Sequence, residues 1–296
     1  MLYGKSDEIL NNGSLLRFEG KIGLIFTSPP FPLNRKKRYG NETGDDYIRW
    51  LSAFGPLFKR MLAPDGSIVI EMGNSWEAGA PVMSTLALRA LLDFLSENSL
   101  HLCQEFIWQN PAKLPSPAQW VNVKRIRVKD SFTKLWWMAP NKTPKANNKR
   151  VLQEYSQSMK DLLRKGSYNA GKRPSEHNIG EASFLKNNGG AIPSNVLTYA
   201  NTLSSDTYQA YCRKKKLQLH PARMPIDLAK FFIKFLTEPG DIVLDPFGGS
   251  NTTGAAAENL RRYWISIEAS KDYIDGSRGR FGDRITSDSV SVMAER

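Results

Sequence analysis

Two short turns of the chain carry the residue types best suited to chemistry, and the first is Thr27-Ser28-Pro29-Pro30-Phe31. This turn follows the apolar run 22–26. Two successive prolines fix two φ angles and remove two N–H donors, so the carbonyls there face something other than a strand partner. With Ser28 before the prolines and Phe31 after them, the turn offers hydrogen-bond acceptors beside an aromatic ring. The pattern fits a loop that binds a nucleobase, and it fits equally well a simple turn that ends a strand.

The second turn follows the apolar run 242–244 and is rich in glycine. A P-loop would need Gly-Lys-Ser/Thr, but Gly254 is followed by alanine, and the dinucleotide pattern Gly-x-Gly-x-x-Gly is absent. Glycines let a backbone approach a ligand closely, and Glu268, at the end of the next apolar run, can accept hydrogen bonds from two ribose hydroxyls. This combination favours a nucleoside cofactor without a pyrophosphate, and a glycine-rich packing turn is the alternative. The candidate cofactor residues are Asp245, Phe247, Gly248, Gly249, Ser250, Asn251, Thr252 and Glu268.

The segments around both turns have the hydrophobic patterns of alternating strands and helices. Such alternation predicts βαβ units and a mostly parallel sheet, in which ligands bind outside the carboxyl ends of the strands. Both turns follow a strand, so both are expected at that edge of the sheet. Helices are expected at 45–61, 86–96, 226–236 and 252–260, and strands at 22–26, 67–72, 102–108, 132–138, 242–244 and 263–267.

The positive charge of the chain is concentrated in its middle third. The formal net charge is +12, and residues 111–219 hold 20 Lys and Arg against 6 Asp and Glu. The rest of the chain is close to neutral, so we interpret the excess as the footprint of a polyanion binder rather than a solvated basic face. Within this region, 124–129 alternates basic and apolar residues, which predicts a strand with one basic face. Residues 140–201 are polar and predict an irregular recognition region with one helix near 151–163.

Composition narrows the class of protein. The 296 residues suffice for one large domain or two moderate ones, and no apolar run approaches the ~20 residues of a membrane span. The start of the chain lacks the pattern of a signal peptide. Cys103 and Cys212 exclude a disulfide framework and indicate a reducing compartment, so a cytoplasmic location is expected. The three histidines form no metal-ligand spacing with the cysteines, so no metal site is expected.

Together the two turns resemble those of amino-methyltransferases that act on DNA. Ser28-Pro29-Pro30-Phe31 is similar to the catalytic loop of N4-cytosine and N6-adenine DNA methyltransferases, and Asp245-Pro246-Phe247-Gly248-Gly249-Ser250 to their cofactor loop. The catalytic loop precedes the cofactor loop, as in the permuted β group. The resemblance covers almost the whole chain and is strongest to the PvuII-type N4-cytosine modification enzymes. The stretches that carry it include 113–117, 120–122, 126–130, 220–223 and 248–254.

This resemblance implies a Rossmann-like α/β methyltransferase fold with permuted motif order and an irregular basic target-recognition region. Residues 1–110 are expected to form the catalytic half, 111–219 the target-recognition region and 220–296 the cofactor-binding half. The implied reaction moves a methyl group from S-adenosylmethionine to the exocyclic N4 of a cytosine flipped out of duplex DNA. A monomer is expected, with a restriction endonuclease of matching specificity as its genetic partner. CAGCTG is the recognition site that the resemblance suggests.

The chemistry of amino methylation assigns roles to the first turn. An exocyclic amino group is a poor nucleophile because its lone pair is delocalised into the ring. Ser28 Oγ and the Pro29 carbonyl are expected to accept its hydrogens and direct the lone pair at the methyl group, while Phe31 stacks on the base. Ser before Pro-Pro favours cytosine by analogy with the family. The alternatives are an N6-adenine methyltransferase and a DNA-binding protein that retains the fold without catalysis.

Two further expectations concern charged residues. Phosphate contacts are predicted for Arg35, Lys36, Lys37, Lys124, Arg125, Arg127 and Lys129. The family usually has Gly-Asp near the start of the chain, but here Gly4 is followed by Lys5. Either Asp7 takes the place of that carboxylate or the contact is missing, and weaker cofactor binding than is typical is expected.

Overall fold

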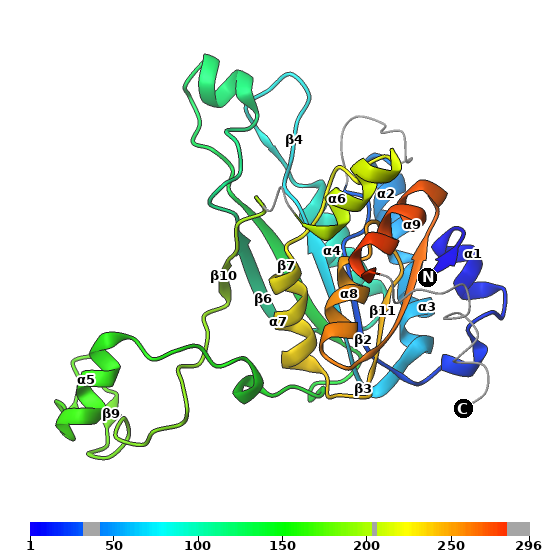
Figure 1. The fold of residues 1–296 in the computed structure, drawn as a ribbon. Helices are drawn as coiled ribbons and strands as arrows, with labels where there is room; N and C mark the ends of the chain where they lie inside the picture. Colours follow the sequence, from blue (N-terminus) through cyan, green and yellow to red (C-terminus); the bar gives the residue numbers. More distant parts are fainter. Residues whose placement is uncertain (32–41, 203–205, 283–296) are drawn as a thin grey trace. The chain divides into compact units, whose positions relative to one another are not determined.

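The computed structural model describes residues 1–31, 42–202 and 206–282, and its centre is a sheet of eight strands (Figure 1). The strand order is β1-β12-β11-β2-β3-β7-β6-β10. Every neighbouring pair is parallel except the two that include β7, which is antiparallel to both β3 and β6. The strands are β1 (Leu2–Tyr3), β2 (Ile22–Thr27), β3 (Leu62–Met72), β6 (His101–Gln109), β7 (Phe132–Ala139), β10 (Val196–Thr198), β11 (Ile242–Asp245) and β12 (Tyr263–Glu268).

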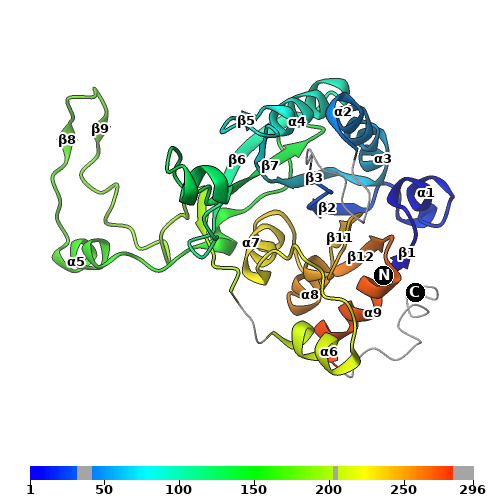
Figure 2. The same cartoon turned by 90° about the horizontal axis from the view of Figure 1, so that it is seen from above.

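Helices cover both faces of this sheet, as Figure 2 shows from above. Three helices lie on one face: α2 (Gly44–Ser52), α3 (Phe54–Met61) and α4 (Leu86–Glu97). On the other face lie α7 (Ile226–Leu236) and α8 (Thr252–Asn259), beside α6 (Thr207–Lys215) and α9 (Lys271–Ser277). The chain also forms α1 (Ser6–Asn11), the short hairpin β4 (Ser75–Trp76) and β5 (Met83–Ser84), and the turns η1 (Leu16–Phe18), η2 (Gln119–Val123) and η4 (Arg278–Arg280).

The central strands are apolar on both faces because helices cover both faces. All six residues of β2 are buried, and the Phe26 ring stacks on Phe232 of α7 at a centroid distance of 5.4 Å. On the opposite face, Phe54 and Phe58 of α3 belong to the same core cluster as β3. Trp136 and Trp137 of β7 are buried as well, in agreement with the apolar pattern of that segment. The fold is the mostly parallel α/β sheet that the alternation predicted.

One expected helix is divided. The pattern at 45–61 predicted a single helix, but α2 ends at Ser52 and α3 begins at Phe54. Pro56 lies in the first turn of α3, where its missing N–H needs no helical partner. A continuous helix would have required that N–H, so the division at Ala53 follows from the proline.

The prediction of a strand at 124–129 is wrong. This segment contains no strand, and Arg125 has a φ of 53°. Ile126 and Val128, which were expected to form a buried face, are 61% and 89% exposed. Alternation alone does not create a strand, because a strand also needs a neighbour with which to pair its backbone. Here the backbone N–H of Ile126 bonds instead to the Trp120 carbonyl oxygen at 3.0 Å.

The chain divides into two compact units, and the smaller one comprises residues 147–194. It contains η3 (Asn148–Val151), α5 (Gln157–Lys165) and the paired strands β8 (Gly171–Lys172) and β9 (Asn178–Ile179). The helix expected at 151–163 therefore begins six residues later, after the Ser156 side chain that caps it. The larger unit takes in residues 1–146 and 195–296, so part of the region 111–219 belongs to the main sheet.

Candidate active site

The two turns singled out in the sequence lie side by side because their strands are neighbours. β11 pairs with β2 in parallel, with Leu244 opposite Ile25. Both strands therefore end at the same edge of the sheet, where the ligands of open α/β sheets bind. The Thr27 hydroxyl, at the end of β2, donates a hydrogen bond of 2.7 Å to Asp245 Oδ1, at the end of β11. This bond ties the first turn to the second.

Asp245 is the centre of a buried hydrogen-bond network. Its Oδ2 accepts a bond of 2.6 Å from the Thr253 hydroxyl, and its Oδ1 also accepts one of 3.1 Å from the Phe247 N–H. Only 4% of Asp245 is exposed. Burial raises the pKa of Asp245 to about 6, although the bonds from Thr253, Thr27 and Phe247 favour the carboxylate. Asp245 thus positions both turns as well as lining the space between them.

The glycine-rich turn has the close backbone packing that its sequence suggested. Gly249 has a φ of +50°, and its N–H donates a bond of 2.8 Å to Glu268 Oε2. A Cβ at Gly249 would lie 3.0 Å from His220 Nε2, and one at Gly248 would lie 2.7 Å from Ser266 Oγ. The backbone there therefore leaves no room for a side chain and exposes its polar groups to a ligand.

Glu268 lies at the end of β12 and keeps part of its acceptor capacity. Its Oε1 accepts a bond of 2.8 Å from the Ser270 N–H, while Oε2 accepts from Gly249. Burial raises the pKa of Glu268, and these backbone bonds oppose that rise. Each carboxylate oxygen has a second acceptor site, so Glu268 retains the capacity to bind hydroxyl groups.

Asn251 has a different position from the other candidate cofactor residues. It adopts a left-handed conformation, and its Oδ1 accepts a bond of 3.2 Å from the Gly254 N–H at the start of α8. The same oxygen accepts a bond of 2.8 Å from the Ser266 hydroxyl. Asn251 is fully buried and caps the helix behind the turn rather than facing the pocket described below.

The sequence analysis did not identify Glu71, whose carboxylate forms a hydrogen bond with Ser28 of the first turn. Glu71 lies near the end of β3, which pairs with β2, and it is 5% exposed. Burial raises its pKa, and a hydrogen bond from the Ser28 hydroxyl partly opposes that rise. The available signal was a lone acidic residue near the end of an otherwise apolar strand.

Two more residues that support the second turn were missed because they come from other parts of the chain. Arg280 donates to the Ser250 carbonyl oxygen at 2.6 Å and to the Ser250 hydroxyl at 2.9 Å. The His220 ring packs on Tyr273 with a centroid distance of 4.6 Å, and burial lowers the pKa of His220 to about 4. His220 is therefore a neutral imidazole, and its buried Nδ1 has no partner among the described residues.

A single pocket of about 1010 Å³ joins the two turns. Its aromatic lining includes Phe31, whose ring packs so closely on Gly73 that a Cβ there would lie 2.5 Å from it. Lys5 and Asp7 also line the pocket. Asp7, the candidate to replace the carboxylate that the family usually has after Gly4, is therefore present at the pocket, as is Lys5. The candidate site residues in its lining are Ser28, Pro29, Pro30, Phe31, Asp245, Phe247, Gly248, Gly249, Ser250, Thr252 and Glu268.

The candidate DNA-binding residues divide into three groups. Arg35, Lys36 and Lys37 lie outside the described residues. The Arg127 guanidinium lies 3.5 Å from the centre of the Trp76 ring, and Lys129 Nζ donates to the Pro111 carbonyl oxygen at 3.1 Å. Lys124 and Arg125 are exposed, and their side chains form no hydrogen bond or ion pair with another described residue.

Neither a metal-binding cluster nor a membrane-spanning helix occurs among the described residues. No group of three or more His, Cys, Asp or Glu residues there is arranged to hold a metal ion. No helix in residues 1–31, 42–202 and 206–282 has the length and apolar character needed to cross a membrane.

The fold and the pocket define a class: an open α/β protein with one large pocket at the carboxyl edge of a mostly parallel sheet. A DNA methylase family model matches residues 22–278. The chain is 42% identical over 290 residues to the type II methyltransferase M.PvuII of Proteus hauseri, which covers 97% of this chain and 85% of that relative. The chain belongs to this DNA methylase family.

Solved structures agree with this membership. The PvuII DNA methyltransferase (cytosine-N4-specific) matches with a TM-score of 0.75 at 36% identity, over 99% of this chain and 90% of that chain. The M1.HpyAVI–SAM complex has the same fold, with a TM-score of 0.54 at 21% identity, over 95% of this chain and 98% of that chain.

Proposed function

We propose that this protein is a site-specific DNA methyltransferase that moves a methyl group from S-adenosylmethionine to N4 of a cytosine in duplex DNA. The observation that carries the proposal is the direct Thr27–Asp245 bond between the two turns, which places them in one pocket. The solved structure of the PvuII DNA methyltransferase is described as cytosine-N4-specific, and M.PvuII is 42% identical to this chain. This similarity supports cytosine over adenine as the target base. Ser28 before the two prolines supports the same choice.

The second turn and its surroundings fit S-adenosylmethionine, whose sulfonium supplies an electrophilic methyl group. The backbone at Gly248 and Gly249 carries no side chain and has no room for one, so a ligand can approach it closely, and Glu268 has acceptor sites for ribose hydroxyls. His220 Nδ1, buried and without a partner among the described residues, supplies a further polar contact. Residues 245, 247–250, 252 and 268 are the proposed cofactor-binding residues, with Asn251 fixing the helix behind them.

The first turn holds the base. The Ser28 hydroxyl donates its hydrogen to Glu71, so the Ser28 Oγ lone pairs remain available to accept from the amino group. The Pro29 carbonyl accepts the second amino hydrogen, and Phe31 stacks on the ring. Ser28 Oγ then relays the proton that leaves the methylated nitrogen to the Glu71 carboxylate, whose raised pKa favours its acceptance.

The wider role follows from this activity. Methylation of one DNA site protects that site from an endonuclease of the same specificity, so we propose a restriction endonuclease as the genetic partner. We also propose a cytoplasmic location. We propose residues 111–219 as the target-recognition region, between catalytic and cofactor halves at 1–110 and 220–296. A monomer suffices, because one chain supplies the whole pocket.

Product analysis tests the proposed function directly. Unmodified plasmid DNA is incubated with the protein and labelled S-adenosylmethionine, digested to nucleosides and separated by chromatography. Labelled N4-methylcytosine is the expected product. N6-methyladenine would retain the cofactor assignment but make cytosine the wrong base, and intact DNA binding without label would favour a catalytically silent protein.

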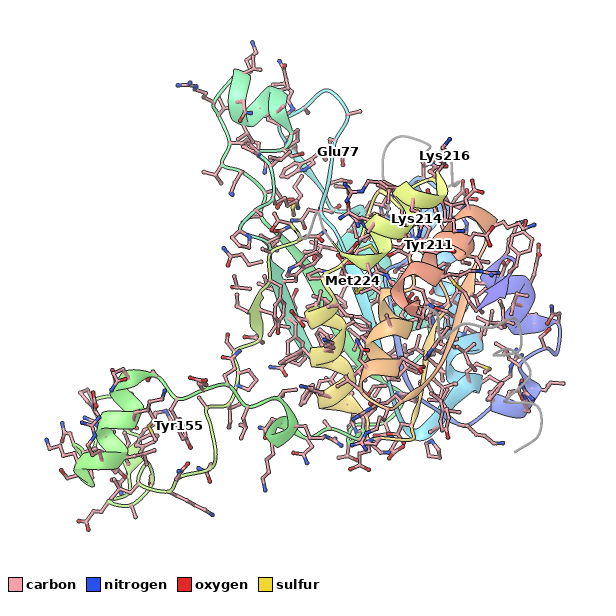
Figure 3. All side chains as sticks on the ribbon, in the orientation of Figure 1. Glu77, Tyr155, Tyr211, Lys214, Lys216 and Met224 are labelled. Carbon is pink, nitrogen blue, oxygen red and sulfur yellow. The ribbon has the colours of Figure 1, made fainter. Side chains whose placement is uncertain are left out.

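The salt dependence of DNA binding shows which basic residues contact phosphates. Replacing Lys124 or Arg125 by Gln is expected to reduce the slope of log K against log salt by about 1 each, because each exposed cation releases a counterion on binding. Filter binding or fluorescence anisotropy from low to high salt measures the slope. Lys214 and Lys216 at the end of α6 provide further exposed cations for comparison (Figure 3). An unchanged slope for both variants would assign the phosphate contacts to another surface.

A further inference from the structure

Two loops of the larger unit are joined into one lobe, defined by residues 73–85 and 110–131. The Arg127 guanidinium stacks on Trp76 at 3.5 Å and donates to the Pro81 carbonyl oxygen at 3.0 Å, so the second loop is fastened to the first. In Figure 1, β4 of the first loop and the helical turn of the second rise beside one another. The lobe is therefore a braced structure rather than two independent loops.

This lobe exposes more apolar side chains than its size explains. Of the 15 large hydrophobic residues that are exposed in the described chain, six lie on it. Exposed apolar side chains that gather in one place mark a binding surface more often than isolated ones do. The six are Val82, Met83, Leu114, Val123, Ile126 and Val128.

Val128 stands out by its exposure and by its place next to the pocket. It is 89% exposed, the largest value among these side chains. The next two residues are anchored at the pocket rim: Lys129 Nζ bonds to the Pro111 carbonyl oxygen at 3.1 Å, and Asp130 pairs with Lys113 at 3.2 Å. Lys113 and Ser131 line the pocket. Three residues of chain span at most ~10 Å, so Val128 is held close to the mouth.

The charges around Val128 identify the partner. Exposed Lys124 and Arg125 precede it, and Lys129 follows it. An apolar tip between cations suits a polyanion that also offers apolar surface, and duplex DNA does so through its stacked bases. A base can enter the pocket only after it leaves the stack, which requires a few kcal/mol of unstacking and unpairing. A side chain that occupies the vacated space offsets part of that requirement.

We propose that Val128 inserts into the DNA duplex at the target base pair and fills the space left by the extruded base. This inference rests on the proposed function, since it concerns the same pocket. A β-branched side chain suits the role because it has few rotamers and loses little freedom on insertion. The anchors at Arg127, Lys129 and Asp130 keep the backbone on both sides of Val128 in place.

The test compares two duplexes that carry the site mapped by product analysis. In one the target cytosine pairs with guanine, and in the other it faces an abasic position, so extrusion needs no unpairing. Single-turnover methylation is measured at saturating enzyme for wild type, V128A and the control L92A. We expect V128A to be about tenfold slower than wild type on the paired duplex and within about twofold of it on the abasic one. L92A, which truncates an exposed aliphatic side chain of α4 outside both the lobe and the pocket lining, is expected to match wild type on both.

A second measurement follows extrusion without chemistry. With 2-aminopurine at the target position, its fluorescence is expected to rise on binding wild type and L92A and to rise much less with V128A. Equal slowing of V128A on both duplexes would overturn insertion in favour of a groove contact, and wild-type rates on both would also overturn it. If wild type methylates neither duplex, the proposed function itself fails, which is a distinct result.

Discussion

Ser28→Ala is expected to slow methyl transfer by on the order of 100-fold or more while leaving DNA and cofactor binding within a few-fold of wild type. The hydroxyl is the acceptor that directs the amino lone pair, and that interaction strengthens only as the nitrogen becomes more tetrahedral. Its loss therefore acts on the transition state rather than on binding. Single-turnover rates at saturating S-adenosylmethionine, together with DNA anisotropy, separate the two effects.

Variants of Ser28 and Glu71 provide the controls. Ser28→Thr keeps a hydroxyl at the same position and is expected to recover part of the rate. Glu71→Gln retains a carbonyl oxygen that accepts from Ser28 but cannot take up a proton, so we expect the rate to fall and to depend less on pH. Wild-type rates for Ser28→Ala would contradict the assignment of Ser28 as the acceptor.

The sequence was most informative where local chemistry and chain order agree. The strands at 22–26 and 242–244 and the helix at 226–236 all appear in the structure within one residue of their expected ends. Each is an apolar run bounded by proline or glycine, so its limits are set locally. The two turns could be placed at one sheet edge because parallel strands place their carboxyl ends together.

Residues that act through long-range contacts could not be found in this way. Glu71 and His220 line the pocket, and Arg280 bonds to Ser250 from outside that lining. These three residues come from separate parts of the chain, and only the fold brings them to the two turns. Segment 124–129 failed for the same reason: its alternation is local, but strand formation depends on a neighbour that the fold does not supply. The exposure of Val128 also depends on the fold, because the alternating pattern predicted a buried side chain there.

Asp245→Ala is expected to lower the free energy of unfolding by about 3 kcal/mol and to raise KM for S-adenosylmethionine. The substitution leaves the Thr27 and Thr253 hydroxyls and the Phe247 N–H buried without their acceptor. It also breaks the direct link between the two turns, so the cofactor loop is no longer fixed against the catalytic loop. Urea unfolding and initial-rate kinetics measure the two effects.

Asp245→Asn retains the hydrogen-bonding groups of the network but removes the carboxyl group that titrates. Its amide oxygen can face Thr27 and Phe247 and its NH2 group the Thr253 hydroxyl, so the fold is expected to persist. Asp245 has a pKa of about 6 in the folded protein against an ordinary 3.8, so the folded state holds its proton more tightly than the unfolded state does. Its contribution to stability is therefore greatest below about pH 4 and is lost as the pH rises through 6.

The pH dependence of stability, compared between wild type and Asp245→Asn, tests whether the pKa of Asp245 is raised in the folded protein. Relative to Asp245→Asn, which cannot titrate there, wild type is expected to lose about 3 kcal/mol of unfolding free energy between pH 4 and pH 7. Urea unfolding at several pH values gives the difference. Parallel curves would mean that Asp245 is not the protonated carboxyl of the folded state. In that case the Thr27–Asp245 bond would join the turns as a fully ionised contact throughout this range.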